Sequence, residues 1–234
     1  MLLPGLDGTE VLLRPLETAL SSSFRVATVT YPIEGRNGYR DLYPLVEAAV
    51  DRAGAPCSVL GWSFSGPLAL RVAAARPQAV RSIILASTFV RRPIPAMAAV
   101  SPLFVTPVVA SVRALGRLPA WLRRSAEDPL RRDLAQIWER VPARTLAARV
   151  RAVHRVHADE QLAACPQPIL YLAAARDRIV PRRNLDTIRR IRADLNVGEI
   201  PGDHFSIYSN AHAAAELITS FVQRTENDAL QAGN

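Results

Sequence analysis

Three polar side chains of the types that cooperate in nucleophilic catalysis follow one another along this 234-residue chain: Ser63, Asp177 and His204. A serine hydroxyl is a weak nucleophile near neutral pH, so it needs a base to take its proton and an acid to orient that base. Asp177 follows an apolar run at residues 169–172, and His204 follows a short run at residues 196–200. Functional groups gather at the carboxyl ends of strands in a parallel sheet. We therefore predict that Ser63 is a nucleophile, His204 its base and Asp177 the orienting acid.

A nucleophile elbow is predicted around Ser63. The sequence Gly-Trp-Ser-Phe-Ser-Gly at residues 61–66 separates a β-type run at residues 57–60 from an alanine- and leucine-rich run at residues 67–75. Such a strand-to-helix turn is sharp, and it lifts the serine Oγ above the sheet. Small residues are required two positions before and two positions after the serine. Ser65 stands where the second of them is usually glycine.

An oxyanion that forms beside Ser63 needs backbone N–H donors. Phe64 lies at the start of the predicted helix, where N–H groups are free, so we predict that it supplies one donor. The stretch at residues 3–9 contains two glycines, which allow the backbone to expose N–H groups in unusual conformations. The second donor is predicted to be the N–H of Leu6, with Asp7 as the alternative.

The elements that must hold these residues alternate between strands and helices. Predicted strands cover residues 24–31, 57–60, 82–86, 168–173 and 196–200, and predicted helices cover about residues 10–20, 41–53, 67–75, 181–193 and 209–223. The predicted boundary residues are Thr9 and Asp41 as N-caps, Gly54 as a helix end and Pro181 in a first turn. This alternation indicates an α/β fold, a mostly parallel sheet with helices on both faces.

One long segment interrupts the alternation, because no strand is predicted at residues 87–166. We interpret this segment as a helical cap or lid that is inserted into a core made of residues 1–86 and 167–224. Asp128 followed by Pro129 predicts the start of a helix within the cap. Residues 225–234 are predicted to be a frayed tail.

Four motifs together resemble those of the α/β-hydrolase superfamily, and they lie at residues 3–9, 61–67, 176–181 and 202–205. They are most similar to small bacterial serine carboxylesterases of the pimeloyl-carrier methyl ester esterase type. The resemblance implies that Ser63 attacks an ester carbonyl while His204 takes its proton, and that water then hydrolyses an acyl-enzyme. It implies no metal and no organic cofactor. The two leading strands common in the superfamily are not among the predicted elements, which is expected either of a minimal version or of a truncated start, and an exposed first strand would be a sheet edge.

The predicted cap indicates an apolar substrate. Residues 94–112 carry no charged side chain, and three prolines argue against a regular membrane-spanning helix. We interpret them as a lid, in preference to a segment attached to a membrane surface. Trp62, Met97 and Phe104 are predicted to contact the substrate, although Trp62 stands at an elbow position that is more often polar. Such a pocket favours hydrophobic esters of short to medium chain length.

The net charge of +8 comes from arginine alone, since the chain contains no lysine. No recognised nucleic-acid module and no interleaving of aromatic and basic residues occurs, so nucleic acid is not an expected partner. The expected partner is a small-molecule ester. One predicted helix is strongly basic, and we interpret it as a solvated face or, alternatively, as a docking surface for an acidic acyl carrier protein; its arginines are Arg144, Arg149, Arg151 and Arg155.

These observations predict a serine hydrolase that cleaves carboxylic esters. A thioesterase or methyl esterase acting on carrier-bound acyl chains is the alternative enzyme, because the basic helix would suit a carrier. A non-catalytic binding protein on the same fold is the alternative from another class, since a fold does not fix a function.

The remaining signals concern location and metals. Cys57 and Cys165 fall in or beside predicted strands, which is typical of buried thiols in a reducing compartment, and no signal peptide pattern is visible. We therefore expect a cytoplasmic protein. His154 and His157 are three residues apart, but no third ligand with a recognised spacing accompanies them. No metal site is predicted.

Overall fold

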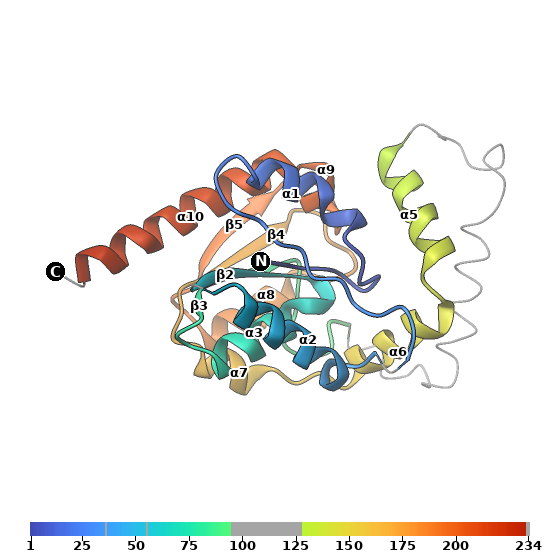
Figure 1. Ribbon diagram of the computed structural model, residues 1–234, viewed down its shortest axis with the longest axis horizontal. Coiled ribbons are helices and arrows are strands. Elements are labelled where there is room, and N and C mark those ends of the chain that lie inside the picture. The colour runs from blue at the N-terminus through green and yellow to red at the C-terminus, as the bar shows by residue number, and fades with distance from the viewer. Residues whose placement is uncertain (36, 55, 95–127, 233–234) are drawn as a thin grey trace.

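The computed structural model describes residues 1–35, 37–54, 56–94 and 128–232 (Figure 1). Within this part of the chain, five strands form one sheet in which neighbours are parallel and the order follows the sequence. The strands are β1 (Leu2–Leu3), β2 (Cys57–Trp62), β3 (Val80–Ala86), β4 (Ile169–Ala174) and β5 (Asn196–Ile200). The parallel sheet and every predicted strand after the first are confirmed.

The strand predicted at residues 24–31 is wrong. The segment makes a single parallel bridge between Thr28 and Leu2, supported by Leu2 N to Ala27 O at 2.8 Å and Val29 N to Leu2 O at 2.9 Å. The reason is the shortness of β1, which offers only two residues of backbone for pairing. The β-forming residue types were present, but a partner long enough to build a ladder was not.

Helices cover both faces of the sheet (Figure 1). On one face lie α1 (Arg14–Leu20), α9 (Ser206–Ser209) and α10 (Ala211–Ala232), and on the other lie α2 (Tyr39–Arg52), α3 (Gly66–Ala75), α7 (Asp159–Ala164) and α8 (Arg183–Ile191). Neighbouring strand residues belong to different buried clusters: Val59 packs with the second set of helices and Leu60 with the first. A strand covered on both faces is apolar at successive positions, as residues 83–86 of β3 are.

Several helix ends differ from expectation. Thr9 is not an N-cap, because its N–H and its hydroxyl both donate to the Asp7 carboxylate, and the chain enters α1 through a 3-10 turn, η1 (Val11–Leu13). Asp41 lies inside α2 at its third position, where its carboxylate accepts from the N-cap Gly38 N–H at 3.0 Å. Gly54 follows the end of α2 with φ of 69°, as predicted. Pro181 lies just before α8 instead of in its first turn.

The predicted frayed tail from residue 225 is instead helical, because α10 continues to Ala232. This stretch contains good helix formers and no proline. An ion pair of 2.8 Å between Arg81 of β3 and Glu226 fastens the extension to the sheet. Figure 1 shows α10 projecting beyond the sheet towards the C-terminus.

The described part of residues 87–166 contains α5 (Pro129–Arg140), α6 (Ala143–His154) and α7. The helix start predicted at Asp128 is confirmed, because its side chain accepts from Leu130 N at 3.0 Å. Whereas α7 packs in the layer of α3 and α8, α5 and α6 lie to one side of the molecule (Figure 1). Residues 95–112 of the predicted lid, with Met97 and Phe104, lie outside the described residues, and the domain boundaries stay a prediction. Among the described helices, none combines the length and the apolar character that a membrane-spanning segment requires.

Candidate active site

The turn after β2 has the geometry of a nucleophile elbow. Ser63 has φ of 49°, a left-handed conformation that costs an ordinary residue about 1–3 kcal/mol, and its side chain is buried. Gly61 is required because a Cβ atom there would lie 2.7 Å from Ser65 O. Gly66 is required because a Cβ atom would lie 2.1 Å from Thr88 Oγ1, and the Thr88 hydroxyl donates to Ser63 O. The backbone therefore crosses closely between Gly61 and residues 65–66, whereas Gly66 makes room for the side chain of Thr88.

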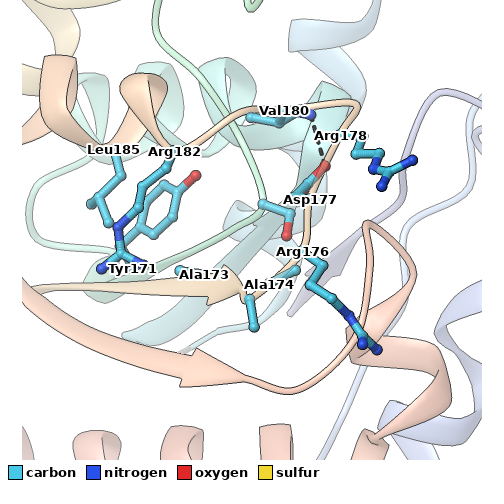
Figure 2. A pocket seen from close by; sticks show the side chains of 11 residues that line it. Tyr171, Ala173, Ala174, Arg176, Asp177, Arg178, Val180, Arg182 and Leu185 are labelled. Atoms are coloured by element: carbon cyan, nitrogen blue, oxygen red, sulfur yellow. Dashed lines mark hydrogen bonds between the residues drawn. The ribbon is translucent and has the colours of Figure 1, made fainter.

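The structure brings Ser63, His204 and Asp177 together in one hydrogen-bonded line. His204 Nε2 lies 2.9 Å from Ser63 Oγ, and His204 Nδ1 lies 2.8 Å from Asp177 Oδ2. The other carboxylate oxygen of Asp177 accepts from Ile179 N at 2.9 Å and from Val180 N at 2.8 Å; Figure 2 shows Val180 beside this carboxylate. The three residues follow the ends of β2, β5 and β4, which is where the sequence placed them.

The surroundings of Asp177 keep it ionised. Burial by itself raises the pKa of Asp177, but the hydrogen bond and the charge of His204, with the two backbone N–H groups, together hold that pKa below its usual value of 3.8. An ionised Asp177 accepts the Nδ1 proton of His204. Nε2 is then left without a proton and accepts the hydroxyl hydrogen of Ser63.

Aromatic rings fix the plane of His204. The Trp62 ring stacks on His204 with centroids 5.9 Å apart and an interplanar angle of 29°, and the Phe205 ring meets it edge-on at 5.7 Å. Trp62 is 2% exposed and lies against Gly5, where a Cβ atom would come within 3.1 Å of its ring. The described contacts of Trp62 thus support the base, and its contact with substrate stays a prediction, as do those of Met97 and Phe104.

The loop at residues 5–8 forms a tight turn. Gly8 N donates to Gly5 O at 3.1 Å, and Gly8 has φ of 70°. Leu6 is half-buried in this turn, and Phe64 is buried in the 3-10 turn η2 (Ser63–Ser65) directly after the elbow. Their roles as oxyanion donors stay predictions.

The prediction that Arg149 lies on an exposed basic face is wrong. Its side chain is fully buried against the loop at residues 5–8. Thr145 and Val153, four residues before and after Arg149, are also buried and lie on the same face of α6. Uncharged residues at this spacing were the sequence signal of a buried face, and the many arginines of the helix obscured it. The other arginines of this helix face outward to differing degrees: Arg144 and Arg155 are exposed, and Arg151 is half-buried and has partners.

The other candidates do not join the site. His154 ends α6 with a pKa that burial and Arg92 lower, and His157 is exposed beside Arg155. Asp203 accepts from Phe205 N at 2.9 Å instead of contacting His204. His212 is exposed on α10, as expected. Across the residues that the structure describes, no group of three His, Cys, Asp or Glu side chains gathers as a metal site would require.

A cavity of about 320 Å³ lies beside the acid loop (Figure 2). It is lined by Tyr171, Asp177, Leu185 and arginines on either side of Asp177. Tyr171 fixes its wall by donating to Thr88 O at 2.9 Å. Ser87 also lines the cavity; it follows β3 with φ of 44° and, like Ser63, is a buried serine at a strand end.

Comparison with known proteins points to one family. Residues 36–201 match a family model described as serine aminopeptidase, S33. A pimeloyl-[acyl-carrier protein] methyl ester esterase of Neisseria meningitidis is 26% identical over 219 residues, covering 87% of this chain and 70% of the relative. The enzyme of that name from Methylococcus capsulatus is 27% identical over 220 residues, covering 87% and 86%. A crystal structure from work on carboxylesterases of Nitrososphaera gargenis shares the fold, with a TM-score of 0.78 and 15% identity over 97% of this chain and 90% of that one.

Proposed function

This chain belongs to the serine aminopeptidase, S33 family of α/β-hydrolases, and from that membership and the site geometry we propose that it cleaves carboxylic esters through an acyl-enzyme on Ser63. The resemblance read from the four sequence motifs is confirmed by the family match. The observation that carries the proposal is the continuous line from Asp177 through His204 to Ser63, with gaps of 2.8 and 2.9 Å.

The proposed reaction has two steps. In the first, Ser63 Oγ attacks the ester carbonyl carbon while His204 Nε2 takes the hydroxyl proton; the tetrahedral intermediate then expels the alcohol, which receives that proton. In the second, His204 takes a proton from water, the hydroxide attacks the acyl-enzyme, and Ser63 Oγ leaves and is reprotonated. Asp177 keeps the imidazole in the required tautomer and stabilises its cationic form. Neither step requires a metal or an organic cofactor.

The negative charge of each tetrahedral intermediate falls on the former carbonyl oxygen. We assign its stabilisation to the backbone N–H groups of Phe64 and Leu6. Donors held in place before the reaction cost no reorganisation when the charge develops, and removal of one such donor typically lowers the rate ~10²–10³-fold. The acyl group is proposed to be apolar and of short to medium length, a choice that rests on the uncharged sequence at residues 94–112.

The test is hydrolysis of p-nitrophenyl esters of increasing acyl length by the protein and by two serine variants. Ser63→Ala should abolish turnover. Ser87→Ala is the matched control, because Ser87 is also a buried serine of positive φ at the end of a strand. This variant should still turn over the esters. Turnover that survives Ser63→Ala would overturn the proposal. Absence of both turnover and fluorophosphonate labelling at Ser63 would favour a non-catalytic binding protein. Cleavage of aminoacyl p-nitroanilides in preference to esters would instead indicate the peptidase activity in the family's name.

A carrier-bound acyl ester is the second candidate substrate. The two relatives described above are esterases of this kind by name, and Arg144 and Arg155 present exposed guanidinium groups on and just beyond α6. An acidic carrier would gain from such a surface. This candidate requires a higher kcat/KM for a carrier-bound methyl ester than for the free ester, and loss of that advantage in the Arg144→Ala, Arg155→Ala double variant. Equal values for the two esters would exclude it.

A further inference from the structure

We propose that Arg149 is a positioning residue that holds the loop at residues 5–8 in the form in which its backbone binds the oxyanion. The inference rests on the proposed function, because it concerns the same reaction. Arg149 belongs to α6, which lies within residues 87–166, the segment predicted from the sequence to be an insertion. Through this one side chain the insertion becomes part of the catalytic apparatus of the core.

The contacts of Arg149 fix successive peptide groups of the loop. Nη1 donates to Leu6 O at 2.9 Å and to Asp7 O at 2.6 Å. Gly5 O is held from within the loop by Gly8 N at 3.1 Å. In a trans peptide the N–H points away from the preceding C=O. Holding the oxygens of Gly5 and Leu6 therefore sets the directions of the next N–H groups along the chain, those of Leu6 and Asp7, which are the two candidate donors.

The second nitrogen of the same guanidinium ties the loop to a different part of the chain. Nη2 donates to Pro32 O at 2.9 Å and to Asn37 Oδ1 at 2.8 Å. Asn37 is itself buried and donates to Glu34 O and Gly35 O, both at 3.1 Å, so its amide is held in place. All four terminal N–H groups of Arg149 are thus used. A lysine has one nitrogen and three donors, and it could not reproduce this fork.

Gly8 shows how closely the guanidinium approaches the loop. A Cβ atom at position 8 would lie 2.4 Å from Arg149 Nη1 and 2.7 Å from its Cζ. Gly8 is therefore needed both for its φ of 70° and for the space that Arg149 occupies. A side chain needed only for charge or solubility would not require its neighbour to lack a Cβ atom.

Arg149 is costly to bury, which argues that it has a role other than stabilising the fold. Burial lowers its pKa to about 10, and the nearby charge of Asp7 offsets only part of the effect. The guanidinium meets neutral oxygens on four sides instead of a directly bonded carboxylate. Such a group contributes little net stability compared with an apolar side chain of similar size, whereas a fixed loop geometry is worth a large factor in rate.

The experiment measures ester hydrolysis and inhibitor binding by Arg149→Ala and Arg149→Lys, with Arg131→Ala as control. Arg131 is an exposed arginine of α5 that pairs only with Asp128, at 3.5 Å, among the described residues. We expect Arg149→Ala to lower kcat ~10²-fold with little change in KM, since the lost contact acts in the transition state. Affinity for a trifluoromethyl ketone, which forms an oxyanion on Ser63, should fall in parallel, while affinity for the parent methyl ketone should not. Guanidinium chloride, at concentrations well below those that denature the protein, should restore kcat of Arg149→Ala. It should not raise kcat of Arg149→Lys or Arg131→Ala.

The outcomes separate positioning from stability. Unchanged kcat in folded Arg149→Ala or Arg149→Lys overturns the inference, and so does equal weakening of the two ketones. If Arg149→Ala does not fold, Arg149→Lys decides: native circular dichroism with a reduced kcat supports positioning, and native circular dichroism with full kcat overturns it. Failure of the proposed function would look different, because the unmodified protein would then hydrolyse no ester in a manner that depends on Ser63.

Discussion

Ser65 donates its hydroxyl hydrogen to the carbonyl oxygen of Pro4, and so joins the turn that carries Ser63 to the loop at residues 5–8. The same hydroxyl oxygen lies 2.6 Å from the hydroxyl of Tyr31. Tyr31 in turn donates its N–H to Gly8 O at 2.8 Å. The motif usually has glycine at this position, but in this chain it is Gly66 that must lack a Cβ atom, because the Thr88 side chain lies against it, and Ser65 makes a polar link.

The first prediction concerns this link. Ser65→Ala should leave the fold intact and lower the free energy of unfolding by ~1–3 kcal/mol, because the buried Tyr31 hydroxyl and Pro4 carbonyl both lose a partner. It should also lower kcat, since the loop at residues 5–8 loses the hydrogen bond that joins its start, at Pro4 O, to the turn that carries Ser63. Urea denaturation and ester kinetics measure the two effects. Ser58→Ala is the control: Ser58 Oγ lies 2.7 Å from Ser82 Oγ in the sheet, away from the loop, and its kcat should equal that of the unmodified protein.

The second prediction concerns the close approach of Gly66 to the side chain of Thr88. Gly66→Ala places a Cβ atom where Thr88 already lies, so the elbow must move or Thr88 must give up its hydrogen bond to Ser63 O. Overpacking of this kind typically costs ~1–3 kcal/mol, and displacement of Ser63 should remove most activity. Gly38→Ala is the comparison, because its nearest neighbour would be Asp41 Oδ2 at 3.3 Å and its φ is −83°. Equal thermal unfolding midpoints and equal activities in the two variants would contradict the reasoning.

The third prediction concerns the acid. Asp177→Asn preserves the shape of the side chain, but Ile179 N and Val180 N hold its one remaining oxygen, so the NH2 group faces His204 Nδ1. A donor at that position selects the wrong tautomer of His204, so kcat should fall by up to ~10⁴-fold. The loss should be largest for kcat, with a smaller effect on KM, because Asp177 does not itself bind the ester. Asp203→Asn is a useful control, since Asp203 is adjacent to His204 yet its carboxylate accepts from Phe205 N instead of from His204. If Asp203→Asn were the more damaging change, the acid would have been misassigned.

The fourth prediction concerns acid stability. The pKa of Asp177 is held below its usual value of 3.8 in the folded protein, so its ionised form stabilises the fold. This contribution is fully present well above the usual value of 3.8 and is lost as the pH falls through the lowered pKa, because the unfolded chain then binds the proton more readily. The free energy of unfolding of the protein should therefore drop more between pH 5 and pH 3 than that of Asp177→Asn. Parallel denaturation curves for the two proteins across this range would refute the linkage.

Much of this site could be predicted from residue types and order. Ser63, Asp177 and His204 each follow a run of strand formers, and a parallel sheet brings strand ends to one edge, so their convergence required no knowledge of distant contacts. The elbow was equally visible because a strained turn needs small neighbours, and Gly61 supplies one. Local sequence carries this information, and the structure places the three side chains within hydrogen-bonding distance of one another.

What escaped prediction depends on partners far away in the chain. Arg149 looks like a solvated residue in its own helix, and only the fold shows that residues 5–8, more than a hundred positions earlier, wrap around it. Residues 24–31 have the composition of a strand but find a two-residue partner in β1. Composition describes what a segment favours, whereas the length of its neighbour decides whether a ladder forms.

The last prediction concerns Trp62, whose ring lies between Gly5 and His204 with an indole N–H that has no described partner. Trp62→Phe should retain most activity, because a phenyl ring can still stack on the imidazole and no hydrogen bond is lost. Trp62→Ala should lower the free energy of unfolding by ~3–5 kcal/mol and lower kcat as well, since His204 loses the surface that fixes its plane. Fluorescence-monitored urea denaturation and ester kinetics measure both variants. A Trp62→Phe enzyme as impaired as Trp62→Ala would mean that the indole N–H itself acts in the reaction, and the packing account of Trp62 would have to be abandoned.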